Sequence, residues 1–99
     1  MSNWPKRENW HDGMKIIFEY EDYIMSVVQF TGSYGYRAGL WEVGFMDKAT
    51  SDFVDPPIDF LSEYKKADPG IYGWMNDPDV DRCHVAMSQI SEYLGGFNE

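Results

Sequence analysis

Two apolar-rich runs, separated by two polar residues, constrain the fold of this chain more than any other feature. In "KIIFEY" (residues 15–20) every second side chain is large and apolar, which is typical of a half-buried strand. The expected buried face consists of Ile16, Phe18 and Tyr20. The β-branched and aromatic run "YIMSVVQF" (23–30) follows after only Glu21 and Asp22, and so short a connection predicts a tight antiparallel hairpin.

A third strand is predicted in "LWEVGFMD" (40–47), where Trp41, Val43 and Phe45 share one face. The short run "DFV" (52–54) predicts a brief fourth strand. Two prolines follow it closely, and because proline cannot donate a backbone hydrogen bond, the strand must end there.

The segment "IDFLSEYKKA" (58–67) has a weaker helical pattern. Phe60 and Tyr64 lie four residues apart, and Asp59 is a suitable capping residue. We predict one or two helical turns here, ending at residues 68–70, Asp-Pro-Gly.

The clearest helix signal comes last in the chain. Asp77 can serve as the N-cap, with Pro78 in the first helical position. An apolar stripe then recurs at steps of three and four, and its members are Val80, Cys83, Met87, Ile90 and Leu94. The Gly95-Gly96 pair is expected to stop the helix. We therefore predict an α+β fold of two layers, in which an antiparallel sheet of three to four strands, a β-hairpin plus a third strand, packs on this C-terminal helix.

The start of the chain differs from the rest. Residues 1–13 are polar apart from Trp4 and Trp10 and show neither a strand period nor a helix period. We interpret them as an N-terminal arm and residues 14–99 as a single α+β domain. The two tryptophans are expected to dock on their own domain, because buried tryptophan area is valuable in so small a protein, and docking on a partner is the alternative.

Charge limits the classes of partner. Seventeen acidic residues against eight basic ones give a net charge of -9 in 99 residues, a field that repels nucleic acid backbones and anionic membranes. We expect no direct nucleic acid binding and no membrane binding, and a partner protein with a basic surface. The single cysteine and the lack of a long apolar run predict a protein of the cytoplasm, or of the host cytoplasm if a phage encodes it.

The stretch "TGSYGYRAGLWEVGF" (31–45) is rich in glycine but does not match a phosphate-binding loop. It lacks the glycine spacing and the lysine of that motif, and it leads into a strand rather than a helix. The glycines can simply relieve backbone strain in a hairpin connection. Alternatively, Tyr34, Tyr36 and Arg37 form a contact patch for a partner, since tyrosine and arginine anchor many protein interfaces.

The run "NDPDVDRCH" (76–84) carries three aspartates at alternate positions, as at the start of an EF-hand loop. Arg82 stands where that loop needs glycine, however, and Ser88 stands where it needs the bidentate glutamate. Helix capping is the better explanation of these aspartates. We expect no metal site and no cofactor.

Catalytic arrangements are also weakly represented. Cys83 and His84 are neighbours, and neighbours on a helix point about 100° apart, so they do not form a nucleophile and base pair. Cys83 belongs to the apolar stripe, and the other histidine, His11, lies in the arm. No pair of carboxylates stands out for acid-base chemistry, and so short a chain has little room for a deep pocket beside its core. We expect no catalytic residue and no enzyme activity.

The acidic residues of the middle and later chain form the second candidate for partner binding. They are Asp47, Asp52, Asp55, Asp59, Glu63, Asp68, Asp77, Asp79 and Asp81. One interpretation is a solvated surface that maintains solubility. The other is an array of carboxylates that occupies a lysine- and arginine-rich groove and competes there with nucleic acid.

The segments "YGYRAGLWEVGFMD" and "GIYGWMNDPDV" resemble a pattern of small, mostly uncharacterised acidic accessory proteins of tailed bacteriophages. The resemblance covers roughly residues 14 to 94, without the segment from Asp55 to Ala67, and it carries over no catalytic residue. Proteins of that group are often inhibitors of host systems, including CRISPR interference and restriction. The resemblance thus implies a non-enzymatic anti-defence or anti-CRISPR inhibitor that acts as a DNA mimic or blocks a recruitment surface.

Three hypotheses follow from these patterns. The leading one is a phage-type inhibitor that binds a host defence protein through the tyrosine loop and the acidic positions. The second is a structural or regulatory module that forms homo-oligomers, with a homodimer as the simplest form. The third is a small enzyme or ligand-binding domain.

Overall fold

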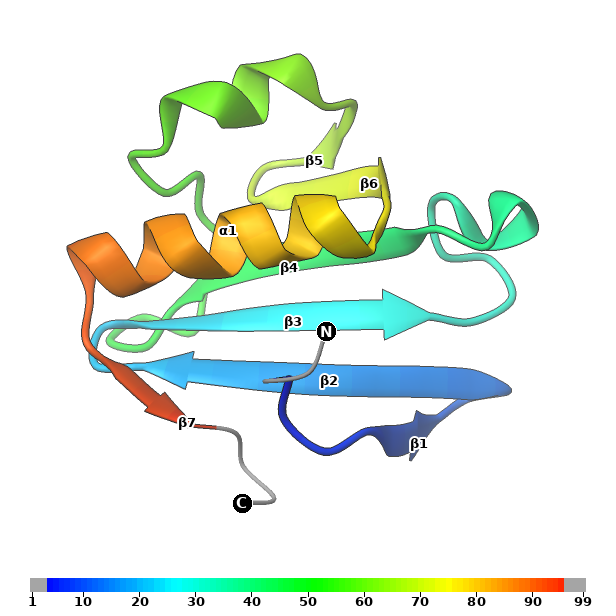
Figure 1. Cartoon of the computed structure of the whole chain (residues 1–99), viewed down its shortest axis with the longest axis horizontal. Helices are drawn as coiled ribbons and strands as arrows, with labels where there is room; N and C mark the ends of the chain where they lie inside the picture. Colours follow the sequence, from blue (N-terminus) through cyan, green and yellow to red (C-terminus); the bar gives the residue numbers. More distant parts are fainter. Residues whose placement is uncertain (1–3, 96–99) are drawn as a thin grey trace.

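The computed structural model describes residues 4–95 and has the predicted α+β fold (Figure 1). Seven antiparallel strands form one sheet in the order β1-β2-β3-β4-β6-β5, and β7 pairs with the remaining edge of β2. The strands are β1 (Glu8–Trp10), β2 (Gly13–Tyr20), β3 (Tyr23–Gln29), β4 (Trp41–Asp47), β5 (Lys66–Asp68), β6 (Ile71–Met75) and β7 (Tyr93–Gly95). The helices are η1 (Tyr36–Ala38), η2 (Asp59–Glu63) and α1 (Asp77–Ile90), of which α1 lies across one face of the sheet.

The central meander of β2, β3 and β4 confirms the predicted alternation. Phe18 pairs with Met25, and Met25 pairs with Phe45, so one row of large apolar side chains crosses three strands. These side chains face α1. The fully buried members of the core include Ile16, Phe18, Tyr20, Met25, Val27, Val43, Phe45, Met75, Val80, Cys83 and Met87.

The start of α1 corrects the predicted capping by one residue. Asn76, not Asp77, is the N-cap, and its side chain accepts a hydrogen bond from the Asp79 backbone N–H at 2.8 Å. The Asp79 carboxylate accepts in return from the Asn76 N–H at 2.9 Å, which completes a capping box. Pro78 therefore occupies the second helical position, where a missing N–H also costs nothing.

The end of α1 is also earlier than predicted. The helix ends at Ile90, and Ser91 is extended, with its buried hydroxyl accepting from the Asp22 backbone N–H at 2.9 Å. The chain then adds β7 to the end of β2 that β1 leaves unpaired, because β1 pairs only with residues 13–15. As a result Ile90 and Leu94 are 39% and 53% exposed and do not extend the buried stripe.

The hairpin of β5 and β6 was not predicted. η2 provides the expected helical turn, but residues 66–68 are a strand rather than the end of a helix, and Gly70 closes the hairpin at φ 75°. A bulge interrupts the alternation of buried and exposed residues along β6. Tyr72 and Met75 are both buried although they lie three residues apart. The predicted fourth strand at 52–54 is reduced to one bridge, between Met46 and Phe53.

The segment interpreted as an arm lies on the domain from Trp4 onward, whereas residues 1–3 lie outside the described part. The Trp4 ring packs edge-on against Phe18 and Trp41, with centroid distances of 6.0 and 5.6 Å. Its indole N–H donates to Asp81. Trp10, in β1, is 38% exposed and lies under the Lys15 ammonium, whose nitrogen is 3.6 Å from the ring centroid.

Candidate functional site

The glycine-rich loop between β3 and β4 is ordered by hydrogen bonds within the loop itself. Ser33 is buried, and its hydroxyl donates to the Phe30 carbonyl at 2.7 Å and accepts from the Phe30 N–H at 3.0 Å. Gly35 and Gly39 flank η1 in the left-handed region, with φ of 98° and 72°. Glycine adopts these angles without steric cost, so the loop can present its side chains from a fixed backbone.

The tyrosines of this loop point to solvent and not into the sheet. Tyr34 is 42% and Tyr36 is 39% exposed, and Arg37 is exposed as well. The Tyr34 N–H donates to the Glu42 carboxylate at 3.1 Å, which fixes the start of the exposed segment. The outward orientation is what a contact patch requires.

Trp74 completes this patch and is held in an unusual conformation. Trp41 pairs with Met75 and Val43 with Tyr72, so β6 has two residues where β4 has one. The extra residue leaves Trp74 with φ 58°, in the left-handed region, and 39% exposed. A bulky residue there costs about 1–3 kcal/mol, and such strain concentrates at functional sites.

The Trp74 ring packs against the loop and against one lysine. Its centroid is 5.5 Å from that of Tyr34, and the Lys65 ammonium lies 4.9 Å from the ring centroid. Gly73 allows this approach, because a Cβ there would lie 2.5 Å from the Tyr34 Cβ. A hollow of about 470 Å³ lies between residues 31–38 and Trp74. We call Tyr34, Tyr36, Arg37 and Trp74 the aromatic end.

Most of the predicted acidic contact residues make bonds within the protein. Asp77 accepts from the Trp41 indole at 2.7 Å, Asp79 from the Tyr64 hydroxyl at 2.7 Å, and Glu63 forms an ion pair with Arg82 at 3.1 Å. Asp81 accepts from Trp4, as described above. These carboxylates hold α1, η2 and the N-terminal segment in place and contribute to the surface charge as well.

Asp55 has the most internal partners among these acids. Its carboxylate accepts from the Lys66 ammonium, from the Gly70 N–H at 2.9 Å and from the Tyr72 hydroxyl at 2.9 Å. The hydrogen bond from Lys66 is the main cause that lowers the pKa of Asp55 below its ordinary value. Asp52 and Asp59 are exposed, as Asp55 is.

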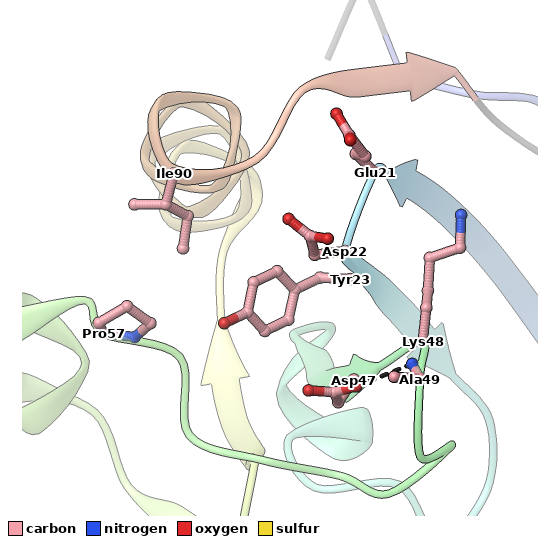
Figure 2. A pocket seen from close by; sticks show the side chains of 8 residues that line it. All are labelled: Glu21, Asp22, Tyr23, Asp47, Lys48, Ala49, Pro57 and Ile90. Atoms are coloured by element: carbon pink, nitrogen blue, oxygen red, sulfur yellow. Dashed lines mark hydrogen bonds between the residues drawn. The ribbon is translucent and has the colours of Figure 1, made fainter.

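Asp47 belongs to an acidic hollow at the other end of the sheet (Figure 2). Glu21 and Asp22 come from the turn between β2 and β3, and Asp47 comes from the end of β4, where it accepts from the Ala49 N–H at 2.8 Å. The Tyr23 ring reaches into the hollow, whose volume is about 530 Å³. Pro57 and Ile90 form its apolar side, opposite the two carboxylates of the turn.

The charge in this acidic hollow is largely uncompensated. Lys48 is the cation among the described residues that line it, and its ammonium pairs with Glu19 at 2.7 Å and donates to the Tyr20 carbonyl at 3.2 Å. Three carboxylates beside a tyrosine ring suit a lysine or arginine side chain, through charge and a cation–π contact.

The two predicted groups of contact residues are not brought together. The aromatic end lies where β4 begins, and Asp47 lies where β4 ends. Seven strand residues span about 20 Å, so one small ligand cannot contact both ends. A macromolecular partner is large enough to contact both ends of β4.

Residues with catalytic or metal-binding potential are engaged in packing. Burial raises the pKa of Cys83 to about 12, so the thiol is protonated and unreactive at neutral pH. The Tyr20 hydroxyl is hydrogen-bonded to His84 Nδ1 at 2.7 Å, within a group of aromatic rings. Among residues 4–95, no three His, Cys, Asp or Glu side chains are grouped so that they could hold a metal ion.

Comparison with known proteins adds no relative. No protein-family model, no curated protein and no solved structure matches this chain. Within the part of the chain that the structure describes, no helix is long and apolar enough to cross a membrane.

Trp74 and the acidic hollow were not predicted from the sequence as components of a site. The signal for Trp74 was its position between Gly73 and the cap of α1, in a segment that interrupts strand alternation. The signal for the hollow was weaker, because Glu21 and Asp22 meet Asp47 only through the pairing of β3 with β4.

Proposed function

We propose that this protein acts by stoichiometric binding to another protein, with the aromatic end as its anchor. The observation that carries the proposal is the exposed Trp74, held at φ 58° against Tyr34. The backbone at Trp74 is strained, although the ring is only partly buried in the free chain. A partner that covers the ring would bury more of its surface and so offset the strain. Tyrosine, tryptophan and arginine are the side chains that most often dominate interface energies.

The charge of the chain supports a basic partner surface. A net charge of -9 attracts a lysine- and arginine-rich protein at long range and raises its association rate. The acidic hollow around Asp47 provides a place for one basic side chain at close range. The acids that bond internally, such as Asp55 and Asp77, contribute to the long-range field and not to direct contacts.

The finer proposal is a phage-type inhibitor of a bacterial defence protein, such as a CRISPR or restriction component. It rests on the sequence resemblance together with the acidic surface, and it has the inhibitor occupy a surface that otherwise binds nucleic acid or recruits another subunit.

The test is affinity capture from a bacterial lysate with three immobilised forms of the chain. Trp74→Gly removes the ring and suits the left-handed backbone, and Val85→Ala removes an apolar side chain that is 57% exposed on α1. We expect one protein to be retained by the wild type and by Val85→Ala and to be lost with Trp74→Gly. Equal retention by all three forms would exclude the aromatic end as the anchor.

The role of charge is tested on the captured pair. Replacing Glu21, Asp22 and Asp47 by their amides keeps the hydrogen-bond acceptors of the turns but removes three charges. Affinity should fall in this variant, and wild-type affinity should fall as the salt concentration rises. If affinity is insensitive to both changes, charge mimicry is excluded as the binding mechanism.

A further inference from the structure

The sheet face opposite α1 has an apolar floor. Ile17 pairs with Ser26 and Ser26 with Gly44, so the middle row of this face has one large side chain beside two small residues. A hollow of about 550 Å³ lies over this row. Trp10 and Phe53, which are 38% and 41% exposed, border the hollow.

The polar residues of this face are arranged symmetrically about β3. Lys15 on β2 and Glu42 on β4 both pair with Val28, so opposite charges lie on either side of the central strand in the same row. Within one chain Lys15 lies 3.6 Å from Glu8, and Glu42 accepts from the Tyr34 N–H. With Glu8, which pairs with Lys15, this row carries two glutamates and one lysine and is only weakly acidic, whereas the chain as a whole is strongly acidic.

This arrangement is complementary to itself. A two-fold axis that runs along β3, between two facing sheets, exchanges the β2 side of one copy with the β4 side of the other. Lys15 then faces Glu42 of the second copy, twice per pair of chains. The same rotation brings Ile17 towards the Phe53 ring, which lies over Gly44 and leaves no room there for a Cβ, so that two apolar side chains meet. From this self-complementarity we infer that the uncovered face binds a second copy of this chain, as a two-sheet homodimer.

The area is compatible with a reversible dimer. Four strands at about 4.8 Å spacing and about 20 Å length give roughly 400 Å² of projected area on each copy. Because accessible surface exceeds projected area, roughly 1,000 Å² would be buried in total, which is the lower limit for a specific interface. We therefore expect a dissociation constant in the micromolar range. Two copies of charge -9 repel each other, so salt should strengthen the dimer by screening that repulsion.

This salt dependence is opposite to the one expected for the basic partner. The dimer face is also separate from the aromatic end, so Trp74→Gly should leave dimerisation unchanged. Failure of the dimer and failure of the proposed partner binding are therefore distinguishable.

The experiment is sedimentation equilibrium of the whole chain over a micromolar dilution series, at low and high salt. Ser26→Lys places a charge in the centre of the face, and Ser88→Lys makes the same substitution at an exposed position of α1. The expected result is a dimer for the wild type and for Ser88→Lys, more populated at high salt, and a monomer for Ser26→Lys with an unchanged circular dichroism spectrum.

Glu42→Gln provides a second variant that leaves the fold intact, because the amide can still accept from Tyr34. Removing the two predicted Lys15 contacts should weaken the dimer by about two- to tenfold. A wild type that is monomeric at both salt concentrations would overturn the inference, and so would a Ser26→Lys variant that dimerises as strongly as the wild type.

Discussion

The conformation of Trp74 gives the most specific prediction of the structure. At φ 58° any residue with a Cβ is strained, whereas glycine is not. Trp74→Ala and Trp74→Gly lose the same contacts, with the Tyr34 ring at 5.5 Å and with the Lys65 ammonium. The difference between the two variants therefore isolates the backbone strain.

The expected magnitude follows from two opposing terms. The left-handed conformation destabilises the alanine variant by about 1–2 kcal/mol. The greater flexibility of glycine in the unfolded chain destabilises the glycine variant by about 0.5–1 kcal/mol. Trp74→Gly should thus be more stable than Trp74→Ala by about 1 kcal/mol, which corresponds to about 4–8 °C in Tm for a domain of this size.

Urea denaturation followed by circular dichroism measures this difference directly. Val85→Ala and Val85→Gly form the matched control pair, because Val85 lies in the helical interior, where glycine is the less stable choice by about 1 kcal/mol. The order of stability should therefore reverse between the two positions. If glycine is also the less stable choice at position 74, Trp74 is not held in the left-handed region and the argument for functional strain fails.

Three further predictions concern packing, capping and pH. Gly73→Ala should destabilise the protein by about 1–3 kcal/mol in urea denaturation, because the new Cβ would lie 2.5 Å from that of Tyr34. Asn76→Ala should cost about 1 kcal/mol through loss of the capping box, while Asn76→Ser keeps a side-chain acceptor at the N-cap and serves as its comparison. Burial lowers the pKa of His84 below the ordinary histidine value of 6.5. The free energy of unfolding should therefore be at its full value above pH 6.5 and should decrease as the pH falls below it. His84→Gln should remove that decrease.

The fold could be predicted where burial follows a regular period. Ile16, Phe18 and Tyr20 alternate in sequence and are all buried, and Val80, Cys83 and Met87 recur at helical spacing beneath α1. The short strands could not be predicted this way. β1 and β7 have three residues each and exist because β2 offers them a free edge, a tertiary effect that local sequence does not encode.

The β5–β6 hairpin was missed for a different reason. The bulge places Tyr72 and Met75 on the same face at a spacing of three, which looks irregular in a strand. The same bulge creates the exposed position of Trp74, so the feature that hid the strand also formed part of the candidate site.

The candidate site was predictable only in its local part. Tyr34 and Tyr36 were identified from residue type within one loop, and their outward orientation agrees with the contact-patch interpretation. The neighbour of Tyr34 is Trp74, which is distant in sequence and reaches the loop only because β6 pairs with β4. The internal bonds of acids such as Asp55 likewise depend on tertiary contacts that composition does not reveal.

Hydrogen exchange on the complex with the captured partner tests the central claim most directly. Backbone amides of residues 31–40 and of β6 should exchange more slowly in the complex than in the free chain, because these segments carry the aromatic end. Exchange on the exposed side of α1, around Val85, should not change. Slower exchange confined to α1, with residues 31–40 and β6 unaffected, would contradict binding through the aromatic end.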